Sequence, residues 1–354
     1  MIINYCIFFF VVTMFFCNFA SNFNHVKHRK MYTIEALQEK VKQSFAEQNF
    51  IYEPKLLYAP IEYTLSQRGK RLRPVLLLAG CDLFDGDCSQ AIDAAIGIEI
   101  FHNFTLLHDD IMDKSPMRRG KETVYKRWNE NIAILSGDTM FAMAYRYFLN
   151  TPHKNLQQIL QVFTETAIEV CNGQQYDMNF ETSETVSLDE YLTMIRKKTA
   201  VLLAGALKIG SLYADCDEID RNHLYEFGIN IGVAFQLQDD LLDAFGDEKT
   251  FGKPIGTDIK DNKKTFLFLK AMEQASDTDK NILKEWFSQI PENNQEKISS
   301  VLKLYNKLNI RDITENEIER YFSKGLQELD LINVATKKKE PLRSFVNQLL
   351  GRKY

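Results

Sequence analysis

The chain has 354 residues, 45% of them hydrophobic and 26% charged, which suits one large globular domain or two ordinary ones. Its formal net charge of −5 argues against nucleic acid or any other general polyanion as a partner, so an anion site must come from a local basic cluster. The six cysteines have no C-x-x-C spacing, which excludes zinc-ribbon and thioredoxin-like proteins and fits free thiols in a reducing, cytoplasmic setting.

The first thirty residues differ from the rest of the chain. Ile2 to Phe16 is strongly apolar, and the basic group Lys27 to Lys30 follows it. A secretory signal carries its positive charge before the apolar run, and this run is short for a membrane span. A signal or anchor, a transit segment and an upstream start codon remain the alternatives. We expect no stable membrane insertion of the core and favour Met31 as the true start, which makes residues 1–30 an extension and residues 31–354 the domain.

From residue 33 onward, apolar residues recur at helical spacing, and no alternating strand pattern is present. Long helices are predicted over residues 91–113, 162–177, 191–212 and 223–245. Two capping boxes, Ser187 with Glu190 and Thr314 with Glu317, predict helix starts, and residues 337–341 are predicted to form an exposed turn. No linker divides the chain, so the prediction is a single all-α domain.

Two acidic clusters of the form D-D-x-x-D lie within these apolar helices: Asp109-Asp110-Ile111-Met112-Asp113 and Asp239-Asp240-Leu241-Leu242-Asp243. Three carboxylates on little more than one turn repel each other, and burying an unpaired charge costs several kcal/mol. One such motif arises by chance in about one chain of this length in ten to twenty, and a solvated helix end explains it equally well. Two of them inside apolar runs indicate a hard divalent cation with oxygen ligands.

The helix before the first cluster carries a polar stripe. At about 100° per residue, His102, Leu106, Asp109 and Asp113 fall on one face, and Asp239 and Asp243 repeat the arrangement on another helix. Two such helices facing each other would place carboxylates across a gap, where metal ions could bind a diphosphate between them.

Basic clusters accompany the acidic ones. They are Gly69 to Pro74, with Lys70, Arg71 and Arg73; Arg118-Arg119-Gly120; Lys197-Lys198-Thr199; and, after the second acidic cluster, Lys253 and Lys263-Lys264-Thr265. Each alone is most often a hydrated surface. Their repeated placement beside the aspartates favours phosphate binding, because guanidinium forks and lysines suit phosphate oxygens.

Taken together, these motifs resemble those of the short-chain trans-prenyl diphosphate synthases, the farnesyl and geranylgeranyl diphosphate synthases. The resemblance runs from about Tyr52 to Thr265 and includes Gly173-Gln174-Gln175-Tyr176-Asp177, Lys198-Thr199 and Phe235-Gln236. It implies a helical bundle of the isoprenoid synthase type with a central cavity, a catalytic domain over residues 31–354 and a homodimer.

The resemblance also implies roles for single residues. A cluster of Mg²⁺ ions would be ligated by Asp109, Asp113 and Asp239, with Asp110, Asp240 and Asp243 in or near the shell. The diphosphate of the allylic substrate would be held by Arg118, Lys198, Lys253 and Lys263. The diphosphate of isopentenyl diphosphate would be held by Lys70, Arg73, His102 and Arg119. Thr199 and Gln236 would lie near the allylic carbon and stabilise its positive charge.

The implied reaction begins when metal and cationic side chains stabilise the departing diphosphate, so that the allylic carbon–oxygen bond ionises. The double bond of isopentenyl diphosphate then attacks, and a proton is lost. Phe104, five residues before Asp109, and Phe101, eight before, would form the floor that limits product length. The small Thr105 beside Phe104 favours a C20 product, geranylgeranyl diphosphate, over C15 farnesyl diphosphate.

Two alternatives belong to other classes. A class I terpene cyclase would carry an N-D-x-x-S-x-x-x-E second motif and would lack the Gly69 to Pro74 cluster. A non-catalytic subunit of a heteromeric synthase would tend to lose aspartates from one cluster, whereas all six are present here.

Overall fold

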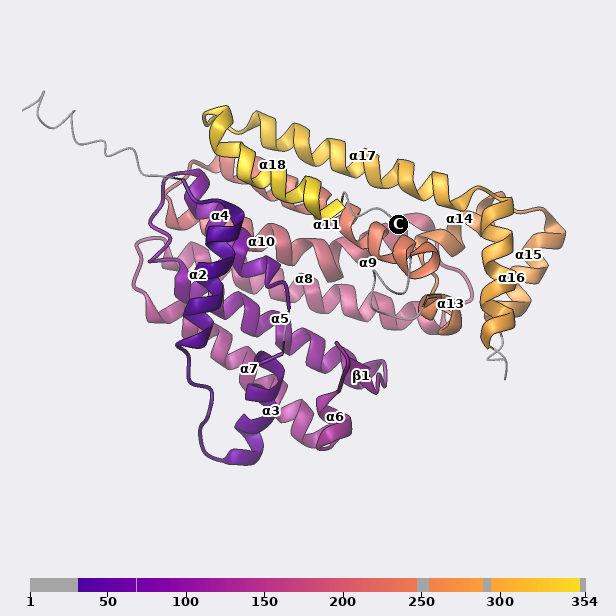
Figure 1. Ribbon diagram of the computed structural model, residues 1–354, viewed down its shortest axis with the longest axis horizontal. Coiled ribbons are helices and arrows are strands. Elements are labelled where there is room, and N and C mark those ends of the chain that lie inside the picture. Colours follow the sequence, from indigo (N-terminus) through magenta and orange to yellow (C-terminus); the bar gives the residue numbers. More distant parts are fainter. Residues whose placement is uncertain (1–30, 68, 247–254, 289–293, 351–354) are drawn as a thin grey trace, which may run out of the picture.

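The computed structural model describes residues 31–67, 69–246, 255–288 and 294–350. The proposed extension over residues 1–30 lies outside this part of the chain. Most of the described residues are helical, as predicted. In Figure 1 the long helices run across the molecule roughly side by side: α5 (Ile92–Met112), α7 (Glu130–Asn150), α8 (Leu156–Thr182), α10 (Val201–Tyr213), α11 (Glu218–Phe245) and α17 (Ile310–Leu331).

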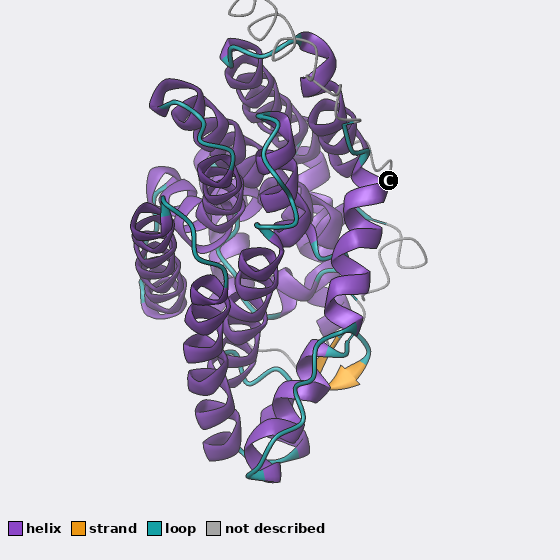
Figure 2. Ribbon diagram, turned by 90° about the vertical axis from the view of Figure 1, so that its left-hand side faces the viewer, coloured by secondary structure: helices purple, strands orange, loops and turns teal. Residues whose placement is uncertain are grey.

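Shorter helices complete the bundle. They are α2 (Ile34–Ala46), α3 (Lys55–Leu65), α4 (Leu72–Leu83), α6 (Val124–Arg127), α9 (Leu188–Ile195), α13 (Thr257–Lys260), α14 (Phe266–Gln274), α15 (Asp277–Ser288), α16 (Asn294–Lys307) and α18 (Thr336–Leu350). Two-residue strands, β1 (Met117–Arg118) and β2 (Lys121–Glu122), form an antiparallel hairpin that stands out among the helices in Figure 2.

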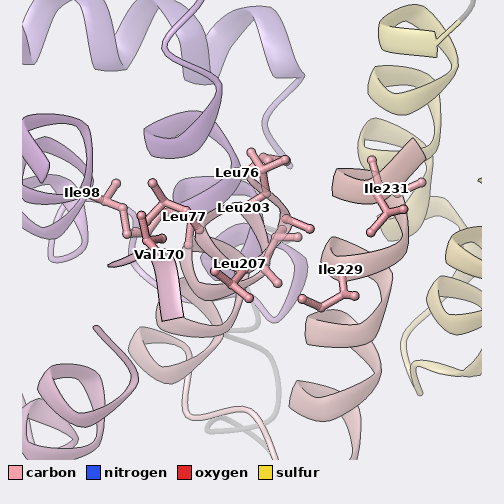
Figure 3. Packing of buried hydrophobic residues seen from close by; sticks show 14 of the residues in the cluster. Leu76, Leu77, Ile98, Val170, Leu203, Leu207, Ile229 and Ile231 are labelled. Carbon is pink, nitrogen blue, oxygen red and sulfur yellow. The ribbon is translucent and has the colours of Figure 1, made fainter. Parts of the chain in front are cut away.

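The core is organised around α10. All but one of its thirteen residues are buried, as expected for a helix that is apolar on every side. It packs against α4, α8 and α11, while α5 packs between α4 and α7. Figure 3 shows Leu203 and Leu207 of α10 close to Leu76 and Leu77 of α4, with side chains of α5, α8 and α11 around them. Burial of this apolar surface holds α5 and α11, the helices of the acidic motifs, in one bundle.

Helix boundaries follow local capping chemistry. The predicted helix over residues 91–113 is confirmed as α5, and the Ser187–Glu190 capping box starts α9. Helix α11 begins earlier than predicted, because the Asp217 side chain accepts hydrogen bonds from two backbone N–H groups of its first turn.

Three sequence predictions were wrong in detail. The single helix over residues 191–212 is divided into α9, a π-helical turn η1 (Arg196–Ala200) and α10. The Thr314 hydroxyl does not cap a helix, since it donates to the Ile310 carbonyl inside α17. Residues 337–341 are not a turn but the first part of α18, which contains Pro341.

Within the described residues, no helix combines the length and the apolar character that a bilayer crossing requires.

Candidate active site

The first acidic motif lies at the C-terminal end of α5, where cations from two other elements reach it. The Arg118 guanidinium donates to Asp110 at 2.6 Å and to Asp109 at 2.9 Å, and Lys198 Nζ donates to the other oxygen of Asp109 at 3.0 Å. Burial raises the pKa of Asp109, but the charges of Lys198 and Arg118 outweigh burial and lower it. Asp109 is therefore held as a carboxylate.

Its two neighbours are less well compensated. Burial raises the pKa of Asp110 to about 6 in spite of Arg118, and burial together with the charge of Asp109 raises the pKa of Asp113. Among the described residues, Asp113 has one ion pair, with Lys263 Nζ at 3.6 Å. Three cations thus face the three carboxylates of the motif, and one of them, Lys198, also pairs with Asp177.

The second acidic motif lies near the C-terminal end of α11, and its three aspartates have different surroundings. Asp240 is buried, and its two carboxylate oxygens accept hydrogen bonds from the Tyr191 hydroxyl and, at 3.0 Å, from Gln236 Nε2. Burial raises the pKa of Asp240 to about 7. Asp239, in contrast, has no hydrogen bond or ion pair with any described residue, which leaves its oxygens available to a ligand.

Asp243 binds a segment that returns to the site. Its carboxylate accepts hydrogen bonds from the Thr257 hydroxyl and, at 2.9 Å, from the backbone N–H of Asp258. These bonds fix the start of α13, and Lys263 follows three residues after that helix. Lys253, predicted to bind the allylic diphosphate, lies outside the described residues.

The π-helical turn η1 presents Lys198 and Thr199 to the site. Lys198 Nζ donates to Asp177 of α8 at 2.6 Å as well as to Asp109. The Thr199 hydroxyl donates to Gln236 Oε1 at 3.0 Å, so a chain of hydrogen bonds runs from Thr199 through Gln236 to Asp240. Single π turns within helices are rare and concentrate at functional sites.

Gly173 allows α8 to approach this turn. A Cβ at Gly173 would lie 2.2 Å from the backbone nitrogen of Lys198, far inside contact distance. The close approach that glycine permits therefore brings Asp177, one turn further along α8, within reach of Lys198.

The predicted isopentenyl diphosphate residues form a second basic group beside the first motif. Arg73 Nη1 lies 3.0 Å from His102 Nε2. Burial and the charge of Arg73 hold the pKa of His102 well below its ordinary value, so its imidazole is neutral. Lys70 is exposed in the same segment. A small pocket opens between Asp110, Arg118 and Arg119, and Asn103 and Leu106 of α5 also line it.

The β1–β2 hairpin joins the two basic groups. Arg119 and Gly120 have φ of 53° and 73°, the left-handed conformations of a tight hairpin turn. Arg118 reaches the aspartates, whereas Arg119 reaches Gly69: its Nη1 lies 2.9 Å from the position a Cβ would take there. Two adjacent residues therefore reach different groups: Arg118 reaches the first acidic motif, and Arg119 reaches the basic group that contains Arg73.

The predicted chain-length residues belong to an aromatic cluster beneath the first motif. Phe104 is half-buried, with its ring centroid 5.3 Å from Phe141 of α7 and 5.5 Å from the buried Phe101. Phe163 of α8 packs against Phe101 at 5.2 Å. The Thr105 hydroxyl bonds back to the His102 carbonyl within α5.

Sequence reasoning missed several residues of this region. Tyr191, Thr257 and Asp258 bind the second motif, and Phe141 backs Phe104, but none stood in a recognisable spacing. Glu99 did carry a signal: this buried carboxylate lies one helical turn before His102, on the polar stripe of α5. Glu99 could have been identified from the sequence, because it is a charged residue within an apolar helix and lies on the same face as His102.

Six carboxylates on two helices, with raised pKa values at Asp110, Asp113 and Asp240, fit hard divalent cations with oxygen ligands. Among the described residues, the one group of three potential ligands whose donor atoms already lie within 4.8 Å is elsewhere, at Cys216, Asp217 and Asp220 near the start of α11. The motif aspartates do not form such a group, and several of them bind cationic side chains or hydroxyl groups instead.

Comparison with known proteins agrees with this geometry. A family model described as polyprenyl synthetase matches residues 54–305. The short chain isoprenyl diphosphate synthase of Methanocaldococcus jannaschii is 41% identical over 230 residues, covering 65% of this chain and 70% of that protein. The geranylgeranyl diphosphate synthase of Sulfolobus acidocaldarius is 35% identical over 283 residues, covering 78% and 84%.

Solved structures agree as well. A crystal structure of a geranylgeranyl pyrophosphate synthase superposes with a TM-score of 0.85 at 44% identity, covering 92% of this chain and all of that one. The two aspartate motifs, the basic groups around them and the all-α bundle thus occur together in a chain that the family model covers for most of its length. The protein belongs to the polyprenyl synthetase family and is a prenyltransferase.

Proposed function

We propose that this prenyltransferase is a short-chain trans-prenyl diphosphate synthase that joins isopentenyl diphosphate to an allylic diphosphate, with geranylgeranyl diphosphate as its main product. The observation that carries the proposal is the meeting of four elements: Arg118 of the hairpin and Lys198 of η1 both bind Asp109 of α5, and Lys263 after α13 faces Asp113. A second basic group lies on the far side of the same hairpin. Two diphosphates therefore have two adjacent sites.

In this proposal the allylic diphosphate lies between the two acidic motifs. Mg²⁺, when bound by Asp109, Asp113 and Asp239, would neutralise the leaving diphosphate and so favour ionisation. Arg118, Lys198 and Lys263 are released from their carboxylate partners to donate to the diphosphate oxygens. Asp240, whose oxygens are both hydrogen-bonded, acts as an anchor for Gln236 rather than as a ligand.

Thr199 and Gln236 orient oxygen atoms toward the reacting allylic carbon. Their mutual hydrogen bond fixes the Thr199 hydroxyl as the donor, so its lone pairs remain for the developing positive charge. The apolar α5 and α7 below the motif exclude water, which would otherwise quench the cation. Neutral His102 and the guanidinium groups of Arg73 and Arg119 hold the second diphosphate, so that the double bond of isopentenyl diphosphate faces the cation.

Product length depends in this proposal on the aromatic cluster. Phe104 and its partner Phe141 lie beneath Asp109 and would stop the growing chain. The names of the relatives, two of them geranylgeranyl synthases, support a C20 product.

We also propose a cytoplasmic homodimer. The four cysteines in the described part of the chain are all free thiols, as a reducing compartment requires. Large apolar side chains are exposed on α7 and α8, namely Ile134, Leu135, Leu149 and Ile168, and they offer surface for a second copy. Light scattering coupled to size-exclusion chromatography checks the dimer, and a monomer at micromolar concentration would contradict it.

The function is tested by incubating the protein with isopentenyl diphosphate, Mg²⁺ and a dimethylallyl, geranyl or farnesyl primer, followed by product chromatography. Elongated diphosphates support the synthase, a hydrocarbon supports a terpene cyclase, and no product supports a non-catalytic subunit.

Asp109→Ala and Asp239→Ala should each lower turnover by about a hundredfold or more, since metal-ion charge stabilisation contributes several kcal/mol. Asp312→Ala, at an exposed position on α17, is the matched control and should retain wild-type turnover.

A further inference from the structure

Glu99 is a buried carboxylate that the reaction does not use. It lies on α5, is only 3% exposed, and accepts a hydrogen bond from Asn103 Nδ2 at 3.3 Å on one oxygen. Its other oxygen is buried without a hydrogen-bond partner, and so is Nε of nearby Arg73. A buried carboxylate this poorly satisfied costs several kcal/mol unless other charges compensate it. Its compensation must therefore come from charges in its surroundings.

Those charges are three arginines. Arg71 and Arg73 from the start of α4, and Arg119 from the hairpin, all lower the pKa of Glu99, although burial raises it by more. No ion pair within 4.0 Å joins Glu99 to any described arginine. The interaction therefore acts through space and depends on the charge of Glu99 rather than on the shape of a direct contact.

The arginines in turn need a negative neighbour. Burial lowers the pKa of both Arg71 and Arg73, Glu99 raises it, and the positive charge of Arg119 lowers it further. In a site without substrate, Glu99 is the acidic group that offsets this repulsion at both residues. In the proposed function Arg73 and Arg119 of this cluster bind the diphosphate of isopentenyl diphosphate, so the carboxylate and the substrate share these positive charges.

We propose that Glu99 is the internal counter-charge of the isopentenyl diphosphate site: it stabilises Arg71, Arg73 and Arg119 when the site is empty, and it weakens the hold of Arg73 and Arg119 on the diphosphate when the site is filled. The inference rests on the proposed function of this cluster. It assigns Glu99 a positioning and affinity-setting role, not a catalytic one. Because of the Glu99 charge, the site is stable without ligand and releases the diphosphate readily.

Two effects of opposite sign follow for Glu99→Gln, which removes the charge and keeps the shape. The ligand-free variant should melt at a lower temperature than the wild type, because the guanidinium groups lose their counter-charge. It should nevertheless bind isopentenyl diphosphate about fivefold to fiftyfold more tightly, as expected when one negative charge is removed from a partly buried anion site. A purely structural defect would lower stability without tightening binding.

The experiment is calorimetric titration of the full chain with isopentenyl diphosphate in EDTA at fixed ionic strength, with thermal unfolding measured in parallel. Without metal, the six motif aspartates repel a diphosphate, so binding reports on the arginine cluster. Glu99→Asp keeps the charge and should bind like the wild type. Asp220→Asn is the matched control: it removes another buried carboxylate, at the far end of α11, and should lower stability while leaving the Kd unchanged.

Arg73→Met distinguishes failure of this inference from failure of the proposed function, in which the arginine cluster binds isopentenyl diphosphate. If Arg73→Met binds isopentenyl diphosphate as the wild type does, the cluster is not the substrate site and the proposed function is wrong at this point. If Arg73→Met loses binding while Glu99→Gln binds equally or more weakly than the wild type, the site stands and the counter-charge role of Glu99 is refuted. Tighter binding by a destabilised Glu99→Gln establishes the role.

Discussion

Replacing Gly173 by alanine should damage the site while leaving most of the fold intact. The new Cβ would lie 2.2 Å from the backbone nitrogen of Lys198, whereas ordinary contacts begin near 3.4 Å. Because both partners are helix backbone, α8 and η1 must separate by about 1 Å. Lys198 Nζ bonds Asp177 of α8 at 2.6 Å, and that separation takes the pair beyond hydrogen-bonding distance.

The expected magnitudes differ for stability and for activity. Overpacking costs about 1–3 kcal/mol, but replacing glycine by alanine within a helix recovers about 1 kcal/mol, so the melting temperature should fall by only a few degrees. Activity should fall much further. A displacement of about 1 Å in a group that positions substrate costs about a hundredfold, and we expect that loss in kcat/KM for the allylic primer.

The assay is initial-rate kinetics with a varied allylic primer, alongside thermal unfolding. Gly86→Ala is the matched control, because its Cβ would meet Ala214 and Cys81 at 2.6 Å, at the opposite end of α5 from Asp109. That variant should lose stability and keep kcat/KM within about threefold, since α5 rises by about 25 Å between that end and Asp109. Wild-type kcat/KM in a folded Gly173→Ala protein would refute the claim that this close approach positions Lys198.

Other substitutions probe the neighbouring contacts. Phe104→Ala should lengthen the product by opening the floor, although Phe141 behind it remains; an unchanged product in liquid chromatography would remove Phe104 from that role. Tyr191→Phe should cost about 1–3 kcal/mol in denaturant unfolding, because it leaves a buried oxygen of Asp240 unpaired, and an unaltered midpoint would contradict that bond. Lys297→Met should raise the KM of the allylic primer, because buried Lys297 donates a hydrogen bond to Asn262 in the turn before Lys263. Lys307→Met is the control: Lys307 lies on the same helix but binds Asp279, so its loss should leave KM unchanged. Equal KM values for the two variants would contradict a role of Lys297 in positioning Lys263.

The sequence was sufficient for the all-α class and the helices of both acidic motifs, because these depend on local periodicity. Helix α5 was predicted to within a residue, since its apolar run is uninterrupted. The predictions at Thr314 and Pro341 were wrong for a common reason: a capping spacing, or a proline after a basic run, indicates a boundary only when tertiary packing does not continue the helix. Here α17 and α18 pack on α11, and the helices extend through both signals.

The site was harder to predict than the fold. The charged residues of the motifs were identified from the sequence. Residues that contact a motif side chain from a different helix were not. Tyr191 contacts Asp240 from 49 positions away, and Phe141 reaches Phe104 from another helix. No periodicity within a single helix encodes such pairs. The roles of the two halves of the site remain predictions that the kinetic and binding experiments can decide.

The π-helical turn at Arg196–Ala200 has a consequence for engineering and for comparing relatives. It accommodates one more residue than an α-helical turn, so deleting a single residue there would restore a regular helix, keep α9 and α10 in nearly their present orientation, and remove the widened turn that presents its side chains to the site. Lys198 and Thr199 would both still be encoded, yet one of them would turn away from the aspartates. A homologue can therefore contain every expected side chain and still be inactive, and a one-residue gap at this position would be a stronger warning of lost function than many substitutions elsewhere.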